Sequence, residues 1–143
     1  MPGDHAFQHI AFTELIVDAQ PMAAGSYKTV YQAKWSGKDR SVAVLELRNT
    51  RDAPLTAIQE ETRIFVKLGK HRHLAQLLAT TTHGTSGNQC MLMEFAPRGS
   101  LDLVLNQAAE ADIDVSMPVR ITIGVQVADA MAHLALYLSL IHI

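Results

Sequence analysis

The sequence has little excess charge of either sign and almost no cysteine. Its 12 basic and 14 acidic residues leave a formal net charge of −2, whereas a nucleic-acid binder normally shows a basic face. The single cysteine, Cys90, cannot form an internal disulfide, which excludes a secreted disulfide framework. Residues 1–10 lack the basic-then-apolar order of a signal peptide. These absences predict a reducing, cytoplasmic setting and no nucleic acid among the partners.

The composition is that of a folded domain. Apolar residues make up 48% of the 143 residues and charged residues 18%, so a globular core is expected. One apolar stretch, residues 121–143, is long enough to cross a bilayer. Asp129 near its middle would cost about 2.5–3.5 kcal/mol on insertion. A buried helix is therefore predicted there, and a membrane-anchored fragment is the weakest alternative.

The first half of the chain predicts short strands and one helix. Three strands are expected between Val17 and Leu47, two of them joined by the turn residues 35–39. Apolar residues at helical spacing follow, up to Leu68, and Gly69 ends the run. The order of elements continues with strands over 74–82 and 89–95, joined by the turn-rich segment 83–88.

Two helices are expected in the last third. Ser100 can cap a short helix that runs to about Leu105. Ser116, Met117 and Pro118 then open a long apolar helix. Cys90 lies in the second strand of the later pair among apolar neighbours, which predicts a buried thiol.

One turn between strands has the composition of a phosphate-binding loop. Residues 23–31 read Ala-Ala-Gly-Ser-Tyr-Lys-Thr-Val-Tyr. A glycine in such a turn lets backbone amides approach phosphate oxygens, because no Cβ intervenes. Gly25 is the only glycine here, so an ordinary hairpin is an equally simple interpretation of this segment alone.

Five short sequence motifs, in a fixed order along the chain, together resemble a known family. They are the Gly25–Tyr31 loop, Val-Ala-Val at 42–44, Glu61, His-Arg-His-Leu at 71–74, and Met-Glu-Phe-Ala-Pro-Arg-Gly-Ser-Leu at 93–101. Together they resemble the small lobe and hinge of a protein kinase, with a hinge most like those of tyrosine kinases and tyrosine-kinase-like kinases. The resemblance implies an α+β fold: a five-stranded antiparallel sheet with one packed helix, then a hinge and the first large-lobe helices, truncated. It implies an N-terminal extension over 1–11, a small lobe over 12–96, and a hinge with a partial large lobe over 97–143.

The family's phosphate-holding lysine is missing from its usual position. It should follow Val44, where this sequence has Leu45, and leucine can neither neutralise nor hydrogen-bond a phosphate. The loop resembles that of the with-no-lysine kinases, in which a lysine at the position of Lys28 takes over this role. Two hypotheses stay open: Lys28 is the relocated phosphate-binding lysine, or nucleotide binding is lost and the chain is a pseudokinase-like interaction module.

The resemblance also implies the remaining site residues. Glu61 would be the helix glutamate that pairs with the phosphate-holding lysine, here Lys28. Met93 would stand at the back of the adenine pocket, and Glu94 and Ala96 would offer main-chain groups to adenine. The implied nucleotide-binding residues are Met22, Ala23, Gly25, Lys28, Val30, Ala43, Met93, Glu94, Ala96 and Gly99. The implied ligand is ATP, with magnesium expected only in a full-length parent.

Metal binding and catalysis within this stretch are not expected. His71 and His73 have no cysteine or second histidine pair nearby, so a structural role of His71 in a helix-to-strand loop is preferred over a metal site. The family's catalytic aspartate and magnesium-binding aspartate would follow the long helix. The fragment alone is therefore expected to be inactive, and the exposed apolar face of its last helix predicts a protein partner.

Overall fold

The chain forms an antiparallel sheet with one helix beside it, followed by two further helices. In this computed structural model, residues 8–48 and 55–141 are described. The contacts divide the chain into two units, one of Met1–Gly69 with Ala75–Phe95 and one of Lys70–Leu74 with Ala96–Ile143. The predicted domain boundaries near residues 12 and 97 stay predictions.

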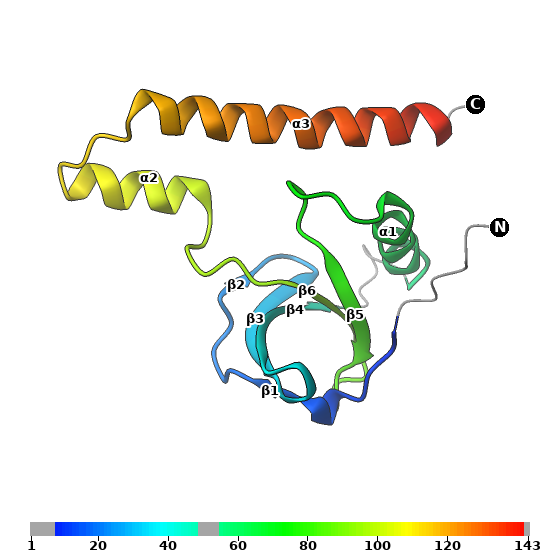
Figure 1. Ribbon diagram of the computed structural model, residues 1–143. Helices are drawn as coiled ribbons and strands as arrows, with labels where there is room; N and C mark the ends of the chain where they lie inside the picture. The colour runs from blue at the N-terminus through cyan, green and yellow to red at the C-terminus, as the bar shows by residue number, and fades with distance from the viewer. Residues whose placement is uncertain (1–7, 49–54, 142–143) are drawn as a thin grey trace. The chain divides into compact units, whose positions relative to one another are not determined.

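The first unit is built on a strongly curled sheet (Figure 1). Its strands are β1 (Leu15–Val17), β2 (Ala23–Ala24), β3 (Lys28–Trp35), β4 (Arg40–Leu47), β5 (Leu77–Thr82) and β6 (Gln89–Glu94). The order across the sheet is β1-β3-β4-β6-β5, and β2 also pairs with β3. All named strand pairs are antiparallel.

The α+β class is confirmed, with one difference in the strand count. Six strands are present where five were expected. The difference arises because β1 pairs with Ala33–Trp35 and β2 pairs with Thr29–Val30. Two short strands thus share one edge of β3, and the sheet is five strand positions wide.

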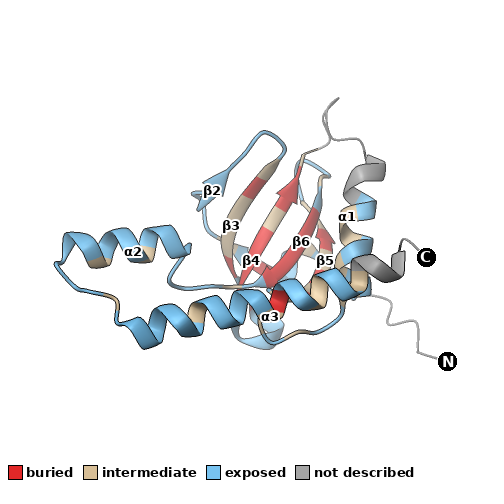
Figure 2. Cartoon of the chain, turned by 90° about the horizontal axis from the view of Figure 1, so that it is seen from above, coloured by how far each residue is buried: buried red, intermediate tan, exposed pale blue. Residues whose placement is uncertain are grey.

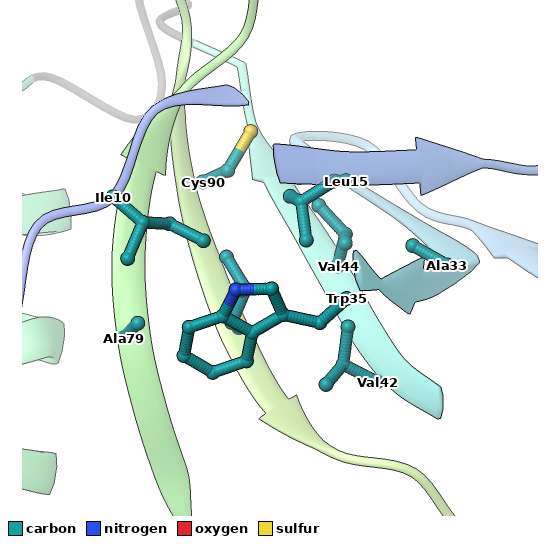
Figure 3. Close-up of a cluster of buried hydrophobic side chains, with 9 residues drawn as sticks. Ile10, Leu15, Ala33, Trp35, Val42, Val44, Ala79 and Cys90 are labelled. Carbon is teal, nitrogen blue, oxygen red and sulfur yellow. The ribbon is translucent and has the colours of Figure 1, made fainter. Parts of the chain in front are cut away.

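The alternation of β3, β4 and β6 divides the core between the two faces of the sheet. One face carries a buried cluster around Trp35, with Val42, Val44 and Leu92 among its members. Figure 3 shows the Trp35 ring lying between Val42, Ile10 and Ala79. The ring nitrogen donates to Glu14 Oε2 at 3.1 Å, which satisfies the buried N–H.

Ile10, which precedes β1 in the sequence, also belongs to the buried cluster on this face. Its backbone N–H donates to Thr80 O at 2.9 Å, and Thr80 N–H donates to Gln8 O at 3.0 Å. Its side chain is only 3% exposed. Residue 10, expected in an extension, is therefore part of the core.

The opposite face of the sheet packs against α1 (Leu55–Leu68). Its buried cluster is Ala43, Leu47, Leu77, Met91 and Met93, with Phe65 of α1, Val30 and Leu45 packed against it. Gly69 follows the helix with φ of +64°, the left-handed conformation that ends helices at glycine. The predicted helix and its stop are thus both present.

The second unit contains two largely exposed helices, α2 (Leu101–Glu110) and α3 (Met117–Ile141). α2 continues past the predicted end near Leu105, and the Ser100 side chain makes no capping hydrogen bond. The prediction was too short because the apolar pattern of the next turn, at Ala108 and Ala109, is weak. Figure 2 shows buried residues concentrated in the sheet, while α2 is almost wholly exposed.

Within the described residues, α3 is the one helix that is long and apolar enough to cross a membrane. The stretch concerned is Met117–Tyr137, and 6% of its most apolar window is buried. Large apolar side chains such as Ile121, Val125 and Met131 are each about 60% exposed. Among the described residues, the burial expected for this helix from the sequence is not found. The predicted protein partner for it stays a prediction.

Cys90 should react slowly in the folded chain. The residue is 1% exposed, and burial raises the pKa of its thiol to about 12, with the charge of Glu46 adding to the rise. Because only the thiolate attacks, alkylation by iodoacetamide at pH 8 is expected to be at least about 100-fold slower than in urea. Mass spectrometry of this sole cysteine measures the rate, and equal rates in both conditions would show that β6 is not packed as described.

Candidate nucleotide site

The candidate site begins with a tight hairpin between β2 and β3. Gly25 N–H donates to Lys28 O at 2.7 Å, which closes the turn. Residues 25–28 line a shallow hollow of about 290 Å³ on its surface. A Cβ on Gly25 would meet only Lys28 O, at 3.7 Å. That is an ordinary contact, so the fold itself does not require glycine at this position.

Lys28 extends from the start of β3 to α1. Its ammonium forms an ion pair and hydrogen bond with Glu61 Oε1. The two side chains are 34% and 35% exposed, so the pair is neither buried nor fully solvated. Lys28 lies two residues before Val30, and strand alternation therefore places both on the face that packs against α1. The structure thus brings together the two residues that were named from widely separated phrases.

Leu45 lies on this same face, and its apolar side chain contacts other apolar side chains. It pairs in register with Val30 and Met91 and packs against the cluster that includes Leu47. No positive charge stands at this position. The ammonium that pairs with Glu61 is instead that of Lys28, on the neighbouring strand β3.

The predicted adenine-contacting residues of the first unit form one continuous patch. Ala43 and Met93 are register partners on β4 and β6, are 9% and 6% exposed, and belong to one buried cluster against which Val30 packs. Ala23 pairs with Val30 at the sheet edge. Met22, which precedes it, is 48% exposed.

Glu94 closes β6 at the end of this patch. Its backbone N–H donates to Gln76 O at 2.9 Å, while its carboxylate accepts from the Gln76 N–H at 3.3 Å. The segment after β6 is therefore tied to the segment before β5. This fixes where the backbone leaves the sheet.

Ala96 and Gly99 belong to the second unit and form a turn there. Gly99 N–H donates to Ala96 O at 3.2 Å, and Gly99 has φ of +73°. A Cβ at Gly99 would approach Leu103 Cδ2 to 3.1 Å. Conformation and space therefore both favour glycine before α2. Their contacts with adenine stay predictions.

The histidines of the 71–74 segment pack against α3 within the second unit. His71 Nε2 lies 3.5 Å from Asp129 Oδ2, and its ring stacks on His133 at a centroid distance of 4.6 Å. His71 Nδ1 also accepts the His73 N–H at 3.1 Å. In the described part of the chain, no group of three or more histidine, cysteine or acidic side chains could hold a metal ion. The structural role expected for His71 stays a prediction.

The sequence did not predict that His71 contacts α3 or that Arg48 contacts the hairpin. Asp129 and His133 are one helical turn apart, a spacing that places them on the same face of α3 and that could have indicated a shared partner. Arg48 was also missed, although it contacts the Gly25–Lys28 hairpin. The sequence offers no signal for that contact, because it depends on the register between β3 and β4.

Comparison with known proteins gives consistent matches. Residues 16–142 match the family described as protein tyrosine and serine/threonine kinase. The chain is 32% identical over 129 residues to mouse mitogen-activated protein kinase kinase kinase 10. The aligned region is 89% of this chain and 13% of the mouse protein. The human protein of the same name is 31% identical over 129 residues, with the same coverage of 89% and 13%.

A viral protein matches a shorter part. The putative serine/threonine-protein kinase/receptor R831 of Acanthamoeba polyphaga mimivirus is 30% identical over 99 residues, which is 68% of this chain and 6% of that protein. The chain therefore spans only a small fraction, 13% or less, of the length of these relatives.

The Lys28–Glu61 ion pair should contribute little to stability. Pairs with this exposure contribute about 1 kcal/mol or less, so a double-mutant cycle of Lys28→Met and Glu61→Gln should give a coupling free energy of about 0.5 kcal/mol by urea unfolding. The matched control is the ion pair of Lys34 and Asp39, whose side chains are 59% and 86% exposed, and it should give no measurable coupling. Equal coupling in the two cycles would mean that Lys28 is a solvated lysine.

Proposed function

This chain belongs to the protein tyrosine and serine/threonine kinase family, and from that premise we propose that it is the ATP-binding part of a protein kinase. In the longer protein it would serve phosphoryl transfer from ATP to serine, threonine or tyrosine side chains. The observation that carries the proposal is the ion pair of Lys28 and Glu61. The pair supplies a positioned cation beside the hairpin, while the usual position of the lysine on β4 is occupied by Leu45.

The hairpin and Lys28 fit a phosphate chain chemically. Gly25 carries no Cβ although the fold leaves room for one, which suits a backbone that a ligand must approach closely. Lys28 adds an ammonium next to this backbone, and Glu61 holds the ammonium on the α1 side. The triphosphate with its magnesium supplies the transferable phosphoryl group. The chain's own part is to bind and neutralise phosphate charge.

The apolar patch fits the base. Val30, Ala43 and Met93 present aliphatic surface from three neighbouring strands, and a small side chain at Ala43 leaves space for a flat ring. In this proposal Glu94 and Ala96 supply main-chain donors and acceptors to the adenine edge, and such contacts tolerate side-chain variation.

The second candidate is an interaction module that binds no nucleotide. The observation that favours it is Leu45, whose side chain packs into the apolar cluster at the position where a phosphate-binding lysine would stand. In that case Lys28 and Glu61 would only fasten α1 to the sheet. The two candidates differ in one measurable property, the affinity for Mg-ATP.

Calorimetry and thermal-shift measurements with Mg-ATP should separate the two candidates. If the native chain binds, ligand at 100 times Kd should raise the unfolding free energy by about 2.7 kcal/mol. Lys28→Met should weaken binding by about tenfold or more, because a charge-assisted contact to phosphate contributes roughly 1.5–3 kcal/mol. Adding Leu45→Lys to Lys28→Met should restore part of the affinity.

Lys34→Met is the matched control. It removes a lysine from the same strand that is 59% exposed and paired with Asp39, and it should leave the affinity for Mg-ATP unchanged. Binding by the wild type that Lys28→Met does not weaken would refute the relocated-lysine proposal. No binding by the wild type would favour the interaction module.

A further inference from the structure

Arg48 contacts the phosphate-loop hairpin at two of its carbonyl groups. Its backbone N–H donates to Tyr27 O at 2.8 Å, and its guanidinium Nη2 donates to Gly25 O. Arg48 directly follows β4, whose last register pair is Leu47 with Lys28. One residue therefore ties the turn between β2 and β3 to the end of a third strand.

Glu46, two residues before Arg48, is the acidic group that feels its charge, since Arg48 contributes to lowering the pKa of the Glu46 carboxyl. The Nε of Arg48 is buried and makes no hydrogen bond within the described part of the chain. The hydrogen bonds of Glu46 go to other groups: its Oε1 accepts from Ser86 Oγ at 2.8 Å and from Asn88 Nδ2 at 2.9 Å. The hydrogen bond from Nη2 to Gly25 O is therefore the side-chain contact that holds the guanidinium against the hairpin.

The direction of one peptide group follows from this contact. All described peptide bonds are trans, and in a trans peptide the C=O and the following N–H point in opposite directions. Since Arg48 holds the Gly25 carbonyl, the Ser26 N–H points away from Arg48. If this peptide group were reversed, the Gly25 carbonyl oxygen would take the place of the Ser26 N–H and would repel an anion there. The contact with Arg48 disfavours that reversal.

We propose that Arg48 is a positioning residue, which sets the orientation of the Gly25–Ser26 peptide and so presents the Ser26 amide and Lys28 to a phosphate group. The proposal rests on the nucleotide-binding function proposed above. It assigns to Arg48 an action through the hairpin, without direct contact with the phosphate. Arg48 would therefore matter for the phosphate part of a nucleotide and not for its base.

Two measurements on Arg48→Met and Arg48→Lys test the proposal. The first is hydrogen exchange of the 25–28 amides without nucleotide, which should quicken by about tenfold in Arg48→Met, equivalent to about 1.4 kcal/mol of lost protection. The second is the ratio of Kd for adenosine to Kd for Mg-ATP, which should fall by about fivefold or more while Kd for adenosine stays constant. Arg48→Lys keeps the charge but loses the planar fork and should give intermediate values.

Arg40→Met is the control, because Arg40 is an exposed arginine at the other end of β4, paired in register with Trp35. It should change neither quantity. Unchanged exchange of the hairpin in Arg48→Met would overturn the positioning role, whatever the nucleotide data show. A merely structural role would lower the melting temperature and leave the Kd ratio as in the wild type, which also overturns the proposal.

The two proposals fail in different ways. If the wild type binds Mg-ATP no more tightly than adenosine, the phosphate site itself is refuted and the presentation role of Arg48 with it, although the exchange data still decide whether Arg48 holds the hairpin. If the wild type prefers Mg-ATP and both Arg48 variants keep the full preference, only the positioning role is refuted. Should Arg48→Met not fold, Arg48→Lys decides by the same two readouts.

Discussion

The unbroken register between β3 and β4 determines which side chains lie on each face of the sheet. Eight residue pairs join the two strands, from Lys28 with Leu47 to Trp35 with Arg40. Because side chains alternate between the two faces along each strand, this single alignment separates the Trp35 cluster from the cluster under α1. A shift by one residue would exchange the two faces.

The same register explains how Lys28, on β3, reaches Glu61 of α1. Lys28 stands at the first position of β3, beside the hairpin, and on the face that α1 covers. A lysine at Leu45 would approach Glu61 from β4, whereas Lys28 approaches it from the neighbouring strand. Lysine suits such a change, since its ammonium is a compact charge on a flexible four-carbon stem. With Lys28 paired to Glu61, the position of Leu45 holds an apolar side chain that packs against the buried cluster.

The two faces of the hairpin region carry different cations. Lys28 pairs with Glu61 on the α1 side. Arg48 lies on the alternate set of residues, two positions after Glu46, and its N–H groups donate to backbone carbonyls of the hairpin. In the proposals above, Lys28 is the cation that meets a phosphate, and Arg48 is the cation that positions the loop. A glycine that the fold does not require lies between them.

Hydrophobic periodicity and turn chemistry were enough to predict β3 to β6, α1 and its glycine stop, because these are local properties of the chain. The division of the first edge of the sheet into β1 and β2 was not predicted. Ordered motifs were enough to identify the kinase family. Only the tertiary structure decided that Lys28 contacts Glu61 and that Arg48 grips the hairpin. It also decided that His71 lies against Asp129 and His133. These contacts join segments 23 to 62 residues apart, and their geometry depends on strand register and helix packing, which no short stretch of sequence encodes by itself.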